Sequence, residues 1–196
     1  MSASAAAPFK LDGPLPELLA RIDAPPEAQP VLAGARNAAE AMERLAAAGF
    51  LLEAAKLTAH ALPKREAVWW ACMCARHTAP EGLPALVELV AAAETWVRKQ
   101  SDETRRAAFD LAQAKGLDTP EAWACVGAFW SGDSMAPAGL AKVPPAPHLC
   151  GTAVAGSINL AAVRGDPMRA RARLARFLDS AREIATGGAG RLPPGG

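Results

Sequence analysis

The sequence predicts an all-α protein, a single domain built as a helical bundle or as a short α-solenoid of stacked hairpins. Alanine, the strongest helix former, makes up about a quarter of the 196 residues. Tyrosine is absent, and valine, isoleucine and threonine together account for only about a tenth of the chain, so an extended β-sheet lacks its usual residues. The apolar content of 51% is enough for a core, and turn signals divide the chain into about eight helices.

The first part of the chain contains four helix patterns separated by turn residues. Leu15–Ile22 ends at an Asp-Ala-Pro-Pro sequence, and Ala35–Ala48 carries apolar residues at helical spacing before a glycine. The third helix, from Phe50 to about Ala61, ends before Pro63, because a residue that precedes proline resists helical backbone angles. The fourth runs from Pro63 to about His77 and begins with proline, whose missing N–H costs nothing in the first turn.

Three further helices are expected between residues 84 and 130. An amphipathic helix covers Pro84–Val97, and Ser101 or Asp102 caps the next helix, which ends before a Lys-Gly pair. The sequence Asp-Thr-Pro-Glu at 118–121 carries two start signals for the third helix. Either Thr119 caps it with proline in the first position, or the flanking acidic residues form a capping box.

A Pro- and Gly-rich stretch at 131–147 predicts an internal loop, and two more helices follow it. The first, Cys150–Val163, is rich in Gly, Ala and Ser, so other helices can approach it closely and it is expected at the centre of the fold. The last helix begins at Asp166-Pro167 and ends at Gly187-Gly188, with its apolar residues on one face.

The two ends of the chain and its charge bear on organisation and compartment. Residues 1–12 and 187–196 are rich in Gly, Pro and Ala and are expected to be flexible ends around one helical domain at 13–186. Neither a secretory signal nor an apolar run of roughly 20 residues is found, so we expect a cytoplasmic protein without an integral membrane segment. A net charge of +1 argues against a nucleic-acid partner.

Trp70-Ala71-Cys72 recurs as Trp123-Ala124-Cys125, each time in the third helix of a three-helix block. An internal duplication would produce this pattern, and so would chance similarity between Ala-rich helices. The sequence leaves both explanations open.

His148 and Cys150 are the strongest candidates for chemistry. A thiol in the first turn of a helix has its thiolate stabilised by the positive end of the helix dipole, and His148 lies two residues away. A thiol-dependent enzyme is one interpretation, with Asp133 or Asn159 as an orienting partner. In the alternative, His148 lines the start of the helix while Cys150 packs in the core.

No metal or cofactor site is predicted. Cys72 and Cys74 point about 200° apart on a helix, so they cannot share an ion, and Cys74 with His77 supplies only two ligands. The other cysteine, Cys125, lies among apolar residues, as expected for reduced thiols in the cytoplasm. Phosphate-binding loops, dinucleotide fingerprints, zinc-protease motifs and nucleophile elbows are all missing from the sequence.

Exposed tryptophan and arginine side chains are the candidate interaction surface. Trp69 and Trp70 differ by about 100° around their helix, so one of them can pack in the core while the other lies at an edge, where tryptophan is a frequent hot spot. Arg169, Arg173 and Arg176 flank one side of the apolar stripe of the last helix. That helix can bind an acidic protein or an anionic surface, or it can be an ordinary surface helix.

Three short segments carry a resemblance to a known family: the Trp-Trp-Ala-Cys helix at 69–72, the Pro-rich Val143–His148, and Ala-Val-Ala-Gly at 153–156. In these the chain resembles an uncharacterised bacterial family of small helical proteins associated with secretion loci, especially type VI. The resemblance implies an accessory or adaptor role and carries over no catalytic residues.

The sequence therefore favours a non-enzymatic protein-interaction or adaptor protein. The alternatives are a thiol enzyme using Cys150 and His148, and a protein that binds membranes or nucleic acid through its basic last helix.

Overall fold

The computed structural model describes residues 9–195, and within that range the chain is all-helical. It contains α1 (Leu15–Ile22), the short 3-10 helix η1 (Pro26–Ala28), α2 (Gln29–Leu32), α3 (Ala38–Ala47), α4 (Leu51–Ala61), α5 (Lys64–Thr78), α6 (Pro84–Lys99), α7 (Asp102–Lys115), α8 (Pro120–Trp130), α9 (Leu149–Val163), the 3-10 helix η2 (Pro167–Arg169) and α10 (Ala170–Ala185). The predicted all-α fold class is confirmed.

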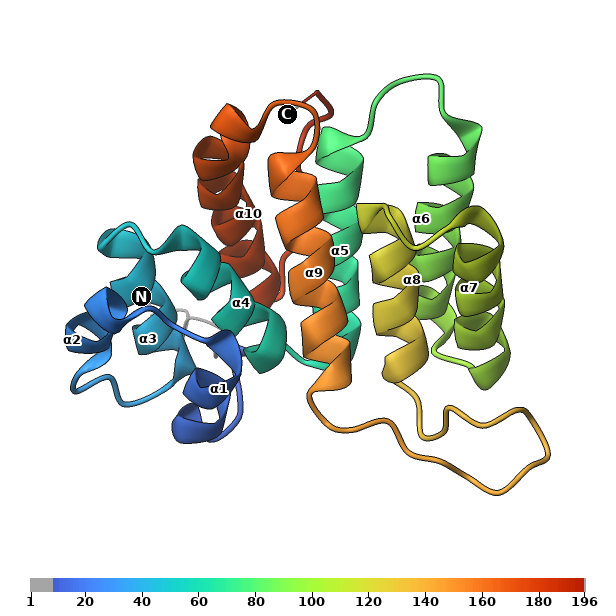
Figure 1. The fold of residues 1–196 in the computed structure, drawn as a ribbon, viewed down its shortest axis with the longest axis horizontal. Coiled ribbons are helices and arrows are strands. Elements are labelled where there is room, and N and C mark those ends of the chain that lie inside the picture. The colour runs from blue at the N-terminus through green and yellow to red at the C-terminus, as the bar shows by residue number, and fades with distance from the viewer. Residues whose placement is uncertain (1–8, 196) are drawn as a thin grey trace, which may run out of the picture.

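The central helices are α5 and α9, which lie side by side (Figure 1). On one side of them α4 and α10 pack, followed by α3 and α1, and on the other side lie α8, α6 and α7. Because α9 is rich in small residues, it contacts α4, α5, α8 and α10 at once, as its composition predicts. Gly127 on α8 allows one such approach, since a Cβ there would lie 3.3 Å from Val154 Cγ2.

The core is formed by apolar side chains from these central helices. Trp70, Leu57, Ile158 and Phe177 are each fully buried and come from α5, α4, α9 and α10. Burial of such side chains is the main favourable contribution to folding. No helix within residues 9–195 is long and apolar enough to span a bilayer.

Two of the helix caps follow the sequence closely. The Ser101 side chain accepts a hydrogen bond from Thr104 N (3.2 Å) and starts α7, and Thr119 accepts one from Ala122 N (3.2 Å) and starts α8. Of the two signals at 118–121, the structure uses threonine as the cap, with Pro120 in the first turn. This agrees with the preference for a cap side chain ahead of a proline that has no N–H to satisfy.

Two segments differ from the sequence prediction. The helix expected from Ala35 begins at Ala38, because the Asn37 side chain accepts a hydrogen bond from Glu40 N (2.9 Å) and caps it. Residues 26–32, for which the sequence predicts no helix, form η1 and α2. Their prolines occupy first-turn positions, where proline starts a helix rather than ending one.

The two tryptophans of the repeated Trp-Ala-Cys sequence, which leaves internal duplication open, lie in different surroundings. Trp70 is fully buried and donates a hydrogen bond from Nε1 to the Phe177 carbonyl (2.8 Å), whereas Trp123 is half-buried and donates to the Leu117 carbonyl (2.9 Å). The cysteines that follow them, Cys72 and Cys125, are both buried.

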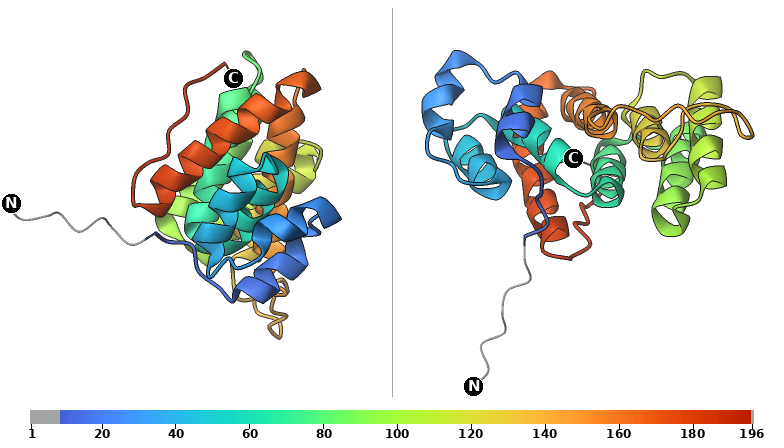
Figure 2. Two further views of the ribbon diagram at one scale, coloured as in Figure 1. Left: turned by 90° about the vertical axis from the view of Figure 1, so that its left-hand side faces the viewer. Right: turned by 90° about the horizontal axis from the view of Figure 1, so that it is seen from below.

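Both ends of the described chain pack against the helices. Lys10 N donates to the Ala185 carbonyl (2.8 Å) and Asp12 N to the Ala61 carbonyl (2.9 Å), so residues 9–12 are tied to the fold. The rest of the predicted flexible N-terminus, residues 1–8, lies outside the described residues. Residues 187–195, from the C-terminal end that is expected to be flexible, run back along α10 (Figure 2, left). Side chains from α5 and α10 donate to carbonyls along this segment, contacts between distant parts of the chain that composition alone does not predict.

Candidate functional site

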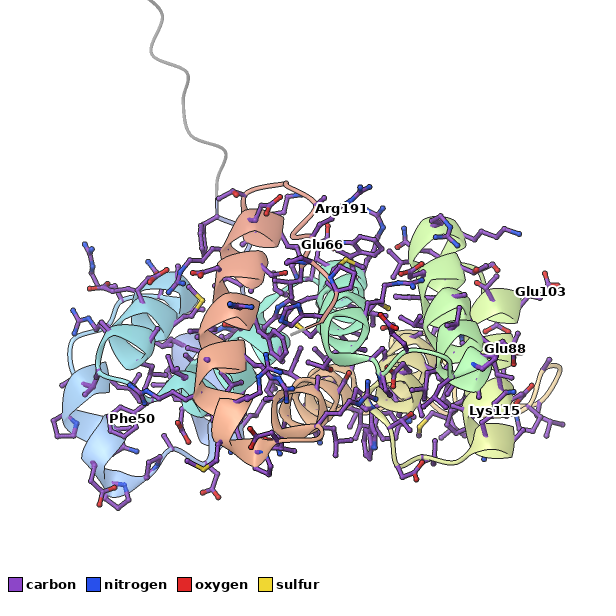
Figure 3. The ribbon with its side chains drawn as sticks, turned by 90° about the horizontal axis from the view of Figure 1, so that it is seen from above. Phe50, Glu66, Glu88, Glu103, Lys115 and Arg191 are labelled. Carbon is purple, nitrogen blue, oxygen red and sulfur yellow. The ribbon has the colours of Figure 1, made fainter. Side chains whose placement is uncertain are left out.

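A surface cleft of about 380 Å³ lies between α5, α6, α10 and the C-terminal segment. We call it the Trp69 cleft. Its lining residues are Lys10, Arg65, Glu66, Trp69, Val97, Arg98, Ile184, Gly187, Gly188 and Ala189. Figure 3, seen from above, shows that α10, the C-terminal segment with Arg191, and α5 with Glu66 lie next to one another on this face.

Trp69 forms a wall of this cleft and is held by a single hydrogen bond to the C-terminal segment. Its side chain is half-buried, and Nε1 donates to the Ala189 carbonyl (2.7 Å). Its neighbour Trp70, about 100° further round the helix, points into the core and is 0% exposed. Trp69 therefore remains a candidate for the interaction surface. Trp70 does not, because its side chain packs in the core.

Positive charge exceeds negative charge around the cleft. Lys10, Arg65 and Arg98 line it. The one lining carboxylate is that of Glu66, whose Oε1 lies 3.9 Å from Lys10 Nζ, and Arg98 Nη1 also lies 3.7 Å from Glu94 Oε2. Arg65 Nε donates to the Val97 carbonyl (2.9 Å), which holds its guanidinium at the rim. An indole face beside guanidinium and ammonium groups suits a ligand with an apolar part and a negative charge.

The basic stripe predicted on the last helix is narrower in the structure. Arg169 and Arg176 are exposed, but Arg173 is only 6% exposed and donates to the Ala162 carbonyl (3.0 Å) at the end of α9. Arg173 is therefore removed from the predicted surface, because its guanidinium satisfies carbonyls that a helix C-terminus leaves open. Arg182 is paired with Glu43 by two contacts of 2.7 and 2.8 Å.

Cys150 is not activated by its position in the first turn of α9. It is buried, and burial raises the pKa of its thiol above the usual value, although a contact with Ser131 Oγ (3.2 Å) acts in the opposite direction. His148 is exposed and caps nothing with its side chain. The predicted orienting residues lie elsewhere, since Asp133 pairs with Lys142 in the exposed loop and Asn159 is exposed on α9. The desolvation of the thiolate outweighs the opposing effects of Ser131 and Lys64 on this pKa.

A different histidine, His60 of α4, packs against the start of α9, and no sequence pattern points to it. A Cβ at Gly151 would collide with the ring of His60, so glycine is what lets this ring pack there. Burial, with smaller effects from Arg21 and His148, lowers the pKa of His60 to about 4. The ring is therefore neutral near pH 7.

The two cysteines and His77 of α5 also serve packing. Burial raises the pKa of both Cys72 and Cys74 well above the usual value, and His77 Nδ1 donates to the Pro193 carbonyl. Within residues 9–195 no group of three or more His, Cys, Asp or Glu side chains could hold a metal ion.

The cleft includes residues that sequence patterns did not single out, namely Lys10, Arg65, Arg98 and the C-terminal segment. They come from four separate parts of the chain, and each cation taken alone resembles an ordinary surface residue. The one usable signal is Trp69, a large aromatic residue next to a core tryptophan.

These features define a class of protein: a small helical domain with an open, cationic cleft beside a half-buried tryptophan. The chain belongs to a family of unknown function, DUF6931, whose model matches residues 41–185. This match covers α4 to α10 and most of α3, so the core and most of the cleft lie within the family's range. Comparisons with curated proteins and with solved structures gave no match to this chain.

Proposed function

We propose that this protein is a non-enzymatic interaction or adaptor protein and that the Trp69 cleft binds an acidic segment of a partner protein. The single observation that carries the proposal is the composition of the cleft, in which three cations and one carboxylate surround a half-buried indole. Tryptophan and arginine are the residue types most enriched among interface hot spots.

The expected contact has an apolar and a charged component. An apolar side chain of the partner packs on Trp69, Val97 and Ile184, while a neighbouring carboxylate of the partner lies near Arg98 and Lys10. A volume of about 380 Å³ admits a few side chains, not a folded domain, so the partner presents a loop or an extended segment. The charged groups steer association and fix the register of the partner segment, and the Trp69 indole, which the partner covers, contributes most of the affinity.

The cellular setting is part of the same proposal. The motifs at 69–72, 143–148 and 153–156 support a bacterial adaptor in the cytoplasm, accessory to a secretion system such as type VI. An acidic protein partner is favoured over nucleic acid because the net charge of the chain is only +1.

The test is capture of the tagged protein with its partner from native cells, followed by calorimetry with the purified partner. Trp69→Ala is expected to weaken binding by about 2 kcal/mol, roughly thirtyfold, as for an interface hot spot. The double variant Lys10→Gln with Arg98→Gln should also bind the partner more weakly than the wild type does, and its binding should depend less on salt.

The matched control is the double variant Arg169→Gln with Arg176→Gln, which removes the same charge from exposed positions on α10. It should bind as the wild type does. If instead the α10 variant loses the partner and the cleft variant keeps it, the cleft is not the binding site. Loss of function on Cys150→Ser alone would favour the thiol enzyme.

A further inference from the structure

The C-terminal segment is held to the helices by side chains that donate to its carbonyl groups. Trp69 Nε1 donates to the Ala189 carbonyl (2.7 Å), Ser180 Oγ to the Gly190 carbonyl (2.5 Å), and His77 Nδ1 to the Pro193 carbonyl. Two of these donors come from α5 and the third from α10. The segment therefore bridges two helices, and Figure 2 (left) shows it running along them from the end of α10.

One residue fixes this segment tightly. Gly190 is buried at a positive φ of 58°, and a Cβ there would collide with the Ile184 side chain and lie 2.7 Å from the Ser180 carbonyl oxygen. No L side chain combines that backbone angle with so little space. Leu192, two residues further on, packs against the core.

The rest of the segment is loosely attached. Most of residues 187–195 are exposed, and among the described residues no main-chain hydrogen bond joins 189–195 to a helix. Ordering a segment rich in glycine costs conformational entropy, and a few neutral hydrogen bonds together with the packing of Leu192 oppose that cost. Segments with few buried contacts are those that open locally while the core stays folded.

The docked segment also builds the Trp69 cleft. Gly187, Gly188 and Ala189 form one wall, and the bond to Ala189 fixes the plane of the Trp69 ring. Gly187 N and Gly188 N are bonded to the Ile184 and Glu183 carbonyls of α10 (2.9 and 2.8 Å), so undocking of residues 189–195 would take Ala189 out of this wall and release the Trp69 ring at the same time.

We propose that residues 189–195 are a strap that docks and undocks as one unit, while Gly187 and Gly188 stay bonded to the end of α10, and that the docked strap creates the binding-competent form of the Trp69 cleft. The second half of this inference rests on the function proposed above. Linkage then requires reciprocity, because a partner that binds only the docked form must also hold the strap in place.

Trypsin provides the test, because Arg191 offers a cleavage site inside the strap and the loss of residues 192–196 can be followed by intact mass. Cleavage of the full-length protein reports the population of the open form. Gly190→Ala should raise the rate at Arg191 at least tenfold. Gly195→Ala is the matched control, since it has a similar positive φ of 87° but nothing within 4 Å of the added Cβ, and it should leave the rate unchanged.

Hydrogen exchange of the Trp69 indole N–H, assigned by Trp69→Phe, tests whether the strap moves as a unit. In Gly190→Ala it should speed up by the same factor as cleavage, while the Trp123 indole, bonded to Leu117, stays unchanged. Ser180→Ala is the milder second variant and should raise both rates by a smaller, equal factor. Cleavage of the wild type at the rate of an unstructured peptide would overturn the inference, and so would a rise in cleavage without a rise in indole exchange.

These measurements need no partner, so they separate the strap from the proposed function. With the partner present, cleavage at Arg191 should slow and Gly190→Ala should weaken binding at least tenfold. If the strap behaves as expected but the partner binds Gly190→Ala normally, the proposed role of the strap in the cleft is wrong, while the adaptor function stands. If no partner depends on Trp69, the proposed function of the cleft is wrong, and cleavage at Arg191 and indole exchange alone decide whether the strap undocks as a unit.

Discussion

Replacing Arg164 tests the buried ion pair that links α8 to the end of α9. Glu121 is 1% exposed, and its carboxylate accepts two hydrogen bonds from Arg164, of 2.8 and 2.5 Å. Removing one partner of a buried pair leaves a desolvated charge and typically costs about 3–5 kcal/mol. Here we expect about 3 kcal/mol for Arg164→Met, because Glu121 lies in the first turn of α8, where the helix dipole stabilises a negative charge.

Urea unfolding followed by circular dichroism measures this loss, and a chain of this size should also melt about 10 °C lower. The matched control is Arg182→Met, which breaks a second two-bond Arg–Glu pair between helices, to Glu43, with side chains 31% and 50% exposed. An exposed pair contributes about 0–1 kcal/mol. Equal losses in the two variants would refute the reasoning that burial, not geometry, sets the cost.

Three further predictions concern His60, Cys150 and the two adjacent tryptophans. The pKa of His60 is lowered from 6.5 to about 4, so between these pH values the unfolded chain binds more protons than the native protein. The free energy of unfolding should therefore fall as the pH drops from 6.5 to 4. In urea titrations His60→Gln should flatten that slope, and by NMR the native ring should titrate near 4. Because burial raises the pKa of Cys150, iodoacetamide should modify it at least about tenfold more slowly in the native protein than in urea, and an equally fast native reaction would contradict its burial. Trp70→Phe should lower the free energy of unfolding by about 2 kcal/mol, through lost side-chain volume and the lost bond to the Phe177 carbonyl, and Trp69→Phe should lower it by less than about 1 kcal/mol. Thermal melts that rank the two variants the other way would reverse the assignment of core and cleft.

Local sequence signals predict most helices well. The starts of α7 and α8 depend on Ser101 and Thr119, whose side chains bond backbone groups only a few residues away, so the sequence contains everything needed to predict them. The same holds for the position of α9, since a helix of small residues can be surrounded closely on several sides. The helices at 26–32 are missed because proline both ends and begins helices, and nearby residues do not say which.

The candidate site is much less predictable. Helical spacing shows that Trp69 and Trp70 face different ways, but tertiary packing decides which of them is buried. Arg173 belongs to a regular stripe of arginines and becomes buried because the end of α9 happens to lie against it. The strap looks flexible by composition, and the side chains that hold it come from positions 69, 77 and 180, far away along the chain.

The contacts of two arginines have a consequence for cooperativity. Arg173 on α10 donates to the Ala162 carbonyl near the end of α9, and Arg164, just beyond that end, holds the buried Glu121 on α8. Detaching α10 would uncover the carbonyls at the end of α9 and loosen the turn that positions Arg164. We therefore expect α8, α9 and α10 to form a single foldon whose amides exchange with one common opening free energy, while α1 and α2 at the periphery exchange earlier.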